Sequence, residues 1–166
     1  MRVAGIVLAG GQSRRMGGGD KCLRPLAGRP ILAHIIERAR GQVTALALNA
    51  NGDPARFEAF GLPVVADSVS GFAGPLAGVL AGLDWAAGVP QATHVASFAG
   101  DAPFFPPDLV ARLASAIADD AHDLACAASA GRAHPVFGLW PVALREALRR
   151  AMTREDIRKV DVWTAR

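Results

Sequence analysis

Short apolar runs alternate with amphipathic stretches along most of this 166-residue chain. The apolar runs are rich in Val, Ile, Leu and Ala and have the length of strands buried in a parallel sheet. We expect such strands at residues 2–8, 42–48, 62–66, 93–99 and 124–128. A Gly-containing turn joins the last of these to a further apolar run at residues 136–140, so these two strands are expected to form a hairpin.

The stretches between the strands place apolar residues three and four positions apart, as in helices with one buried side. Helices are expected at residues 30–39, 54–60, 75–87, 106–117 and 141–152, and Thr153 is expected to cap a last one with Asp156. Strands that alternate with helices indicate the α/β class: a doubly wound, mainly parallel sheet with helices on both faces. The pattern contains no repeat and no linker, so residues 1–166 are expected to form a single domain.

The composition narrows the class of protein further. A hydrophobic content of 51% excludes a disordered chain, and the apolar runs are far too short to span a bilayer. Because no secretory signal precedes the first strand, we expect a cytoplasmic protein without membrane contact. The net charge of +3 suits anionic ligands, while no basic run with aromatic residues indicates a nucleic-acid partner. Cys22 and Cys126 are far apart in the sequence, which favours free thiols over a disulfide or a zinc site.

A glycine-rich basic segment, residues 7–21, follows the first strand. The connection to the first helix is about twenty residues long, whereas such connections usually have about 2–6, so a functional or a disordered loop is indicated. Five glycines allow backbone N–H groups to turn inward, and Arg14, Arg15 and Lys21 add positive charge, which favours an anion-binding loop. Lys21 stands between Asp20 and Cys22, so the loop is not a Walker A motif, and the dinucleotide fingerprint is absent too.

Polar residues follow the other predicted parallel strands. Asn49, Asp67 and Asp101 come after the strands at 42–48, 62–66 and 93–99, where ligands bind in open parallel sheets. We expect them to meet the glycine-rich loop at one edge of the sheet. A carboxylate such as Asp101 beside bound phosphates suits Mg²⁺, although an Asx turn before Pro103 is the alternative. Asn49 is either a binding residue or part of a turn, whereas residues 51–54 favour an ordinary turn.

Three weaker candidates for site residues, Gly74, Pro75 and His134, lie outside these strand ends. Gly74, Gly78 and Gly82 share one face of the helix at 75–87, which predicts close packing at Gly82. Gly74 and Pro75 could instead shape access for a ligand. His134 stands before Pro135 and is either a site residue or an ordinary loop residue.

The segment LAGGQSRRMGGGDK, residues 8–21, resembles the signature loop of the molybdenum cofactor guanylyltransferases. The resemblance implies a Rossmann-like nucleotidyltransferase fold and the transfer of GMP from GTP to the terminal phosphate of molybdopterin, with Mg²⁺ and release of pyrophosphate. It also implies cofactor-delivery proteins as possible partners. The resemblance places Leu8, Ala9, Gly10, Lys21, Asn49 and Asp67 on GTP, Asp101 on both GTP and Mg²⁺, and His134 near the pterin side. An acceptor such as Asp67 or Asn49 could select guanine. Together with the residue pattern, we expect Gly11 to join the nucleotide-binding residues, Arg15, Lys21 and Asp101 to act in catalysis, and Gly74 and Pro75 to lie with His134 on the acceptor side.

Members of the resembled family continue past the position of Arg166 into another strand and an Asn-x-Asn-Thr-Pro-Glu-type segment on the pterin side. Nothing in this sequence matches that segment, so we expect the chain to lack it. Three alternatives remain open at this point: a related nucleotidyltransferase that uses CTP, one with a sugar-phosphate acceptor, and a GTP-binding module without catalysis.

Overall fold

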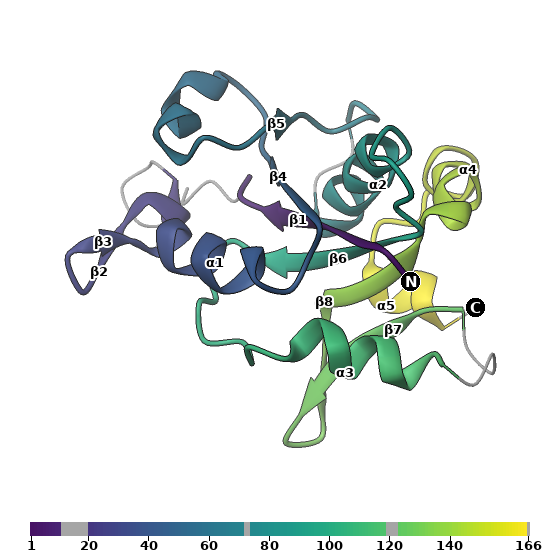
Figure 1. Cartoon of the computed structure of the whole chain (residues 1–166). Coiled ribbons are helices and arrows are strands. Elements are labelled where there is room, and N and C mark those ends of the chain that lie inside the picture. The colour runs from purple at the N-terminus through teal and green to yellow at the C-terminus, as the bar shows by residue number, and fades with distance from the viewer. Residues whose placement is uncertain (11–19, 72–73, 119–122, 166) are drawn as a thin grey trace.

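A six-stranded sheet forms the centre of the molecule in the computed structural model, which describes residues 1–10, 20–71, 74–118 and 123–165 (Figure 1). The strand order across the sheet is β5-β4-β1-β6-β8-β7. The strands are β1 (Val3–Leu8), β4 (Ala45–Asn49), β5 (Val64–Val65), β6 (His94–Ala99), β7 (Ala125–Ser129) and β8 (Arg132–Pro141). The strands β2 (Pro25–Leu26) and β3 (Arg29–Pro30) form a separate small hairpin.

Four neighbouring strands of the sheet run parallel. Strand β1 pairs with β4 on one side and with β6 on the other, and β4 pairs with β5. The register places Leu8 beside both Asn49 and Ala99, so β1, β4 and β6 end level with one another. The predicted mainly parallel α/β fold is confirmed, and the predicted strand ends come together at one edge of the sheet.

Helices cover both faces of the sheet, as its alternating side chains require. Helices α1 (Ile31–Arg40) and α3 (Leu109–Ala116) pack on one face, and α2 (Pro75–Ala86), α4 (Arg145–Glu155) and α5 (Val160–Thr164) contribute to the core on the other. In β1, for example, Val3 and Val7 point to the first face while Ala4 and Ile6 point to the second.

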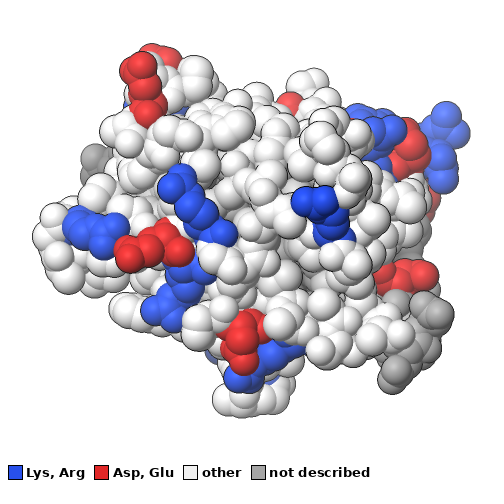
Figure 2. All heavy atoms as spheres, viewed as in Figure 1, with Lys and Arg blue, Asp and Glu red and all other residues white. Residues whose placement is uncertain are grey.

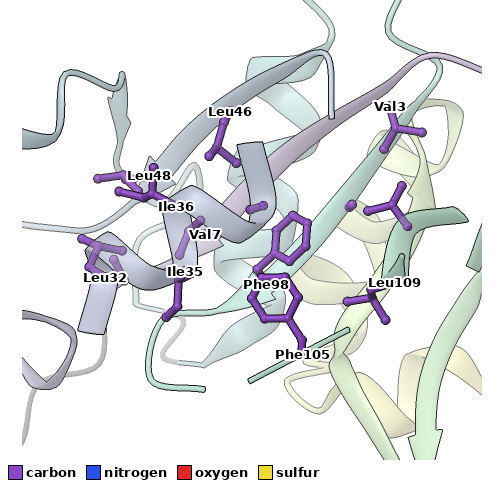
Figure 3. Close-up of a cluster of buried hydrophobic side chains, with 14 of the residues drawn as sticks. Val3, Val7, Leu32, Ile35, Ile36, Leu46, Leu48, Phe98, Phe105 and Leu109 are labelled. Atoms are coloured by element: carbon purple, nitrogen blue, oxygen red, sulfur yellow. The ribbon is translucent and has the colours of Figure 1, made fainter. Parts of the chain in front are cut away.

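The core on the α1 and α3 face contains buried phenylalanine residues (Figure 3). Phe98 of β6 and Phe105 have ring centroids 5.1 Å apart, and Phe137 of β8 lies 5.6 Å from Phe105. Leu32 and Ile35 of α1 are fully buried over the parallel strands. The contacts of Phe105 with Phe98 and Phe137 hold the segment that follows β6 against the sheet.

Helix α2 approaches the opposite face closely because small residues line its inner side. A Cβ atom at Gly82 would lie 2.8 Å from Cγ2 of Ile6, so only glycine fits against β1 at this distance. The predicted close packing at Gly82 is therefore confirmed. Gly78, one turn earlier, contacts Asn49 and Leu8 instead, which brings α2 against two residues of the predicted site.

The hairpin of β7 and β8 completes the sheet with antiparallel pairs. Strand β8 begins at Arg132, four residues before the predicted start, because the turn is confined to Ala130 and Gly131 with positive φ angles of 48° and 74°. Ser97 of β6 ties β8 to the parallel strands: its hydroxyl donates to the carbonyl of Val136 over 2.6 Å and accepts the indole N–H of Trp140 over 2.9 Å.

Several predicted boundaries were wrong. Thr153 does not cap a helix but lies inside α4, where its hydroxyl donates to the carbonyl of Arg149, and Asp156 ends α4 in the left-handed region. The predicted helix at residues 54–60, by contrast, is present with these bounds as the 3-10 helix η2 (Pro54–Phe60). The segments η1 (Lys21–Leu23) and η3 (Val142–Leu144) are of the same type. Helix α1 begins at Ile31 because Pro30 belongs to β3. None of the helices in the described segments is long and apolar enough to cross a bilayer.

Candidate nucleotide site

The carboxyl ends of the four parallel strands are joined by backbone hydrogen bonds beyond the ladder itself. The N–H of Ala9 donates to the carbonyl of Asn49 over 2.9 Å, and the N–H of Ala50 donates to Val65 over 3.1 Å. On the other side, Gly100 donates to the carbonyl of Leu8 over 3.1 Å. The residues that leave these strands are therefore held side by side at one edge of the sheet.

A cavity of about 310 Å³ opens at this edge. It brings together five of the predicted site residues from four separate parts of the chain. Its walls are Leu8, Ala9, Lys21, Cys22, Pro75, Ala99, Gly100, Asp101 and Val136. A basic and an acidic side chain thus share one concave site with backbone from the end of β1, which suits a phosphorylated ligand.

Lys21 is placed at the cavity by the helix η1, where the glycine-rich segment returns to the sheet. The next residue, Cys22, is buried and its Sγ lies 3.6 Å from the carbonyl oxygen of Ala9. Burial, and after it the Asp20 carboxylate, raise the pKa of the Cys22 thiol to about 11, while the Arg56 guanidinium acts in the opposite direction. Cys22 and Cys126 are both free, as predicted, and Cys22 anchors the lysine beside β1.

Asp101 enters the cavity from the end of β6. A Cβ atom on Gly100 would collide with the carbonyl oxygen of Leu8, so glycine is required for the chain to pass this close to β1. Asp101 is exposed, which leaves its carboxylate accessible to a ligand.

The acidic side chain at the cavity suits a cation that is bound jointly by the protein and by a substrate. Within the parts of the chain that the structure describes, no three His, Cys, Asp or Glu residues gather as a metal cluster. One protein carboxylate completed by phosphate oxygens and water is an arrangement that Mg²⁺ favours, because this ion keeps several waters and binds few protein groups. Asp101 fits that role without further protein ligands.

Asp67 and Asn49 meet beside the end of β4. The side-chain amide of Asn49, which is 6% exposed, donates to Oδ1 of Asp67 over 2.9 Å and to the carbonyl of Val65 over 3.2 Å. The Asn51 amide donates to Oδ2 of Asp67 over 2.8 Å, and the Asp67 N–H donates back to Oδ1 of Asn51 over 2.9 Å. We call Asn49, Asn51 and Asp67 the carboxylate clamp.

Asn51 belongs to this clamp although sequence reasoning assigned it to a turn, because an Asn-Gly-Asp-Pro segment favours an ordinary turn. The spacing could have revealed it. Residues 49 and 51 are two apart at a strand end, so both side chains can point to the same side. The structure shows that this spacing gives Asp67 one amide donor on each carboxylate oxygen.

The remaining predicted site residues lie in different surroundings. Pro75 lines the cavity as the first residue of α2, and Gly74 precedes it with a φ of 126°, which favours glycine. His134 is exposed on β8, where its Nε2 lies 2.7 Å from Oγ of Ser129, and it is not part of the cavity wall. Gly10 follows β1 and is exposed. Gly11 and Arg15 lie outside the described residues.

Lys21, Asp101 and the carboxylate clamp lie beyond the carboxyl ends of the parallel strands, which is where open α/β sheets bind their ligands. The family model described as MobA-like NTP transferase domain matches residues 5–164, and the chain belongs to this family. A relative from Bradyrhizobium sp. (strain ORS 278), named molybdenum cofactor guanylyltransferase, is 62% identical over 165 residues, which cover 99% of this chain and 78% of the relative. The resemblance found in residues 8–21 is confirmed.

Solved structures share the fold. Molybdopterin-guanine dinucleotide biosynthesis protein A from Archaeoglobus fulgidus superposes with a TM-score of 0.73 at 22% identity, over 98% of this chain and 77% of the other. The manganese complex of Rv0371C from Mycobacterium tuberculosis H37Rv gives a TM-score of 0.67 at 21% identity, over 99% of this chain and 82% of the other. These similarities confirm the Rossmann-like nucleotidyltransferase fold.

Proposed function

We propose that this protein is a molybdenum cofactor guanylyltransferase, which transfers GMP from GTP to the terminal phosphate of molybdopterin and releases pyrophosphate. The observation that carries the proposal is the cavity shared by Lys21 and Asp101 at the end of β1. The high identity to a relative with that name supports the same activity.

In this proposal, the triphosphate lies along the cavity. Lys21, together with Arg15 and backbone N–H groups of residues 8–11, neutralises the phosphate charge. Asp101 holds Mg²⁺, which when bound offsets the negative charge on phosphate oxygens. Leu8 and Ala9 contribute backbone at the cavity wall, so no side chain blocks the approach of the phosphates.

The carboxylate clamp is assigned to the base. Guanine presents a ring N–H and an amino group side by side, and a carboxylate can accept from both, whereas adenine lacks this pair of donors. The Asp67 oxygens are each fixed by one amide donor, which leaves further lone pairs on both for a base. Asn49 and Asp67 therefore act as the nucleotide-selecting residues.

The chemistry requires positioning rather than a general base. A phosphate nucleophile is already ionised near neutral pH, and its in-line attack on the α-phosphorus forms one P–O bond as the bond to pyrophosphate breaks. Lys21 and Arg15 stabilise the charge that moves to the leaving group. Gly74 and Pro75 at the start of α2 and His134 on β8 are assigned to the acceptor side.

Calorimetric titration of GTP, CTP and ATP tests this function, with and without Mg²⁺, on wild type and on Asp101→Ala. We expect Mg²⁺-enhanced, GTP-selective binding that is lost in Asp101→Ala, followed by pyrophosphate release when molybdopterin is added. The matched control is Asp108→Ala, because Asp108 is exposed at the start of α3 and its carboxylate pairs with Arg112 of that helix.

Each other outcome has a distinct meaning. Selective CTP binding would replace the proposal with a cytidylyltransferase, and pyrophosphate release with a sugar phosphate would change the acceptor. GTP binding without pyrophosphate release would indicate a binding module. Equal binding of all three nucleotides would contradict the base-selecting role of Asp67.

A further inference from the structure

We propose that Arg56 and Asp20 form a positioning pair that fixes Lys21 relative to the carboxylate clamp, so that the phosphate and base sides of the site are held as one unit. The inference rests on the proposed function for its catalytic meaning. It assigns roles to two residues outside the predicted site.

Arg56 joins several segments through one guanidinium group. From η2, its two terminal nitrogens donate to the carbonyl of Asp53 over 2.8 Å and to the carbonyl of Asn51 over 2.7 Å. The guanidinium carbon lies 4.6 Å from the centroid of the Phe57 ring, and Phe57 is fully buried. These contacts hold the Arg56 guanidinium against η2 and the segment before it. They leave its third nitrogen, Nε, for another partner.

That nitrogen meets Asp20. Nε of Arg56 lies 2.7 Å from Oδ2 of Asp20, in an ion pair whose alignment is not that of a hydrogen bond. Asp20 stands at the N-cap of η1, yet its side chain makes no capping bond there and turns to Arg56 instead. A carboxylate that gives up the usual capping role in favour of an arginine indicates that the ion pair determines its orientation.

Burial separates this pair from the ordinary surface pairs of the protein. The Arg56 and Asp20 side chains are 26% and 12% exposed, compared with 69% and 51% for Arg112 and Asp108. On the face shown in Figure 2, basic and acidic side chains are interspersed at the surface, where water screens their attraction and ion pairs contribute little. The Arg56–Asp20 pair is more shielded, so breaking it leaves a poorly solvated charge.

The contacts form a continuous path across the site. Asp67 bonds to the Asn51 side chain, the Asn51 carbonyl accepts from Arg56, and Arg56 pairs with Asp20, the residue before Lys21. Lys21 lines the cavity opposite the end of β6. Arg56 also neutralises the negative charge of Asp20, which would otherwise repel phosphates beside the one described lysine of the cavity.

The experiment compares wild type with Arg56→Gln, Asp20→Asn and the double variant. Affinities are measured for GTP and for inorganic triphosphate, which probes the phosphate side without a base. We expect each single variant to bind both probes about tenfold more weakly, with the double variant no weaker than either, because the two residues act as one unit. Arg112→Gln with Asp108→Asn serves as the matched control and should match wild type.

Cys22 gives a readout that does not depend on nucleotide binding. Cys22 directly follows Lys21 and is 3% exposed, so its labelling by a disulfide reagent reports whether η1 is held in place. We expect faster labelling in both Arg56→Gln and Asp20→Asn. Loss of the Asp20 charge alone would lower the pKa of Cys22, whereas loss of the Arg56 charge alone would raise it. Faster labelling in both variants therefore reports greater exposure of Cys22. Cys126 is the internal control.

The conservative variant Arg56→Lys separates positioning from a general structural role. Lysine keeps the charge but cannot donate in a fixed fork to two carbonyls and pair with Asp20 at once. In Arg56→Lys we therefore expect Cys22 labelling to slow and triphosphate affinity to rise toward the wild-type values, but only in part, because the charge returns without the fixed fork.

Several results would overturn the inference. Unchanged Cys22 labelling in both variants would show that the pair does not anchor η1. Faster labelling with unchanged triphosphate affinity would show an anchor without a positioning role, and additive losses in the double variant would deny the shared unit. If wild type bound no nucleotide, the proposed function would fail, while the labelling would still decide the anchoring.

Discussion

Side-chain amides determine what the acidic residues of this site can do. Asp67 has one oxygen held by Asn49 and the other by Asn51, so its carboxylate plane is fixed before any ligand arrives. A fixed acceptor loses little entropy when it binds, which improves both affinity and selectivity. Asp101, by contrast, is exposed. This suits the proposed role of Asp101 in binding Mg²⁺ beside phosphates that change during the reaction.

Asn51→Ala tests the clamp at this scale. It removes the amide donor to Asp67 and the acceptor for the Asp67 N–H, so we expect GTP affinity to fall about tenfold or more and the preference over ATP to shrink. Titration calorimetry measures both. Ser115→Ala, which removes an exposed hydroxyl on α3, should leave binding unchanged, and equal GTP and ATP losses in Asn51→Ala would argue against a base-selecting clamp.

His94 predicts a pH dependence of stability. Burial, and after it the positive N-terminus, lower the pKa of His94 below its ordinary value of 6.5. The unfolded chain therefore takes up this proton more readily, so the contribution of His94 is complete above about pH 6.5 and is lost as the pH falls below it. We expect wild type to lose more thermal stability than His94→Gln between about pH 7.5 and about pH 5.5. Parallel losses would contradict this prediction.

At the scale of elements, α2 connects the core to the site. Its inner side has Gly82 against Ile6 of β1 and Gly78 against Asn49, so one helix sets both the packing of the sheet and the position of a clamp residue. Its first residue, Pro75, lines the cavity. A change along this helix therefore has different effects one turn apart.

Gly78→Ala and Gly82→Ala separate these effects. A Cβ at Gly78 would collide with Oδ1 of Asn49, so we expect GTP affinity to fall by about tenfold or more together with some stability. A Cβ at Gly82 meets only Ile6 among its nearest contacts, and this variant should lose about 1–3 kcal/mol of stability by overpacking with a smaller effect on affinity. Denaturant unfolding and calorimetry measure the two quantities.

Gly41→Ala is the control for both variants, because nothing lies within 4 Å of its added Cβ and its φ is −73°. It should bind GTP as wild type does. If Gly78→Ala retained full affinity at reduced stability, α2 would have no part in placing Asn49.

For the whole molecule, the two faces of the sheet are filled by separate clusters, and the site lies at the edge that both support. The clamp comes from β4 and the segment after β5, Lys21 from η1, and Asp101 from the end of β6. A ligand that bridges these segments binds the folded state only, so it should stabilise the entire fold by linkage.

GTP with Mg²⁺ at about 100 times its dissociation constant should stabilise the protein by about 2.7 kcal/mol. For a chain of this size that corresponds to a rise in Tm of about 5–10 °C. Scanning calorimetry or thermal-shift fluorescence measures it, and Asp101→Ala should show a much smaller rise. An equal rise in that variant would remove Asp101 from nucleotide binding.

The fold class, and the position of most candidate site residues at one edge of the sheet, could be predicted from the sequence. Buried apolar runs predicted β1, β4 and β6 because such runs must be enclosed on both faces, and polar residues directly after them predicted Asn49, Asp67 and Asp101 at one edge. Boundaries were less secure: Thr153 has the side chain of a cap, yet packing of Leu148 and Met152 extends α4 past it. Local propensity is weaker than burial of a helix face.

Which side chains contact one another depends on the packing of distant segments and could not be predicted from the sequence. The roles of Asn51 and Arg56 depend on contacts across 16 and 36 positions of the chain, to Asp67 and Asp20 respectively. The residues between these partners say nothing about the distance in space, because that distance is set by the order of strands in the sheet and by how η2 packs through Phe57. Local pattern therefore fixes where polar groups leave the strands, and the packing of distant segments fixes which of them act together.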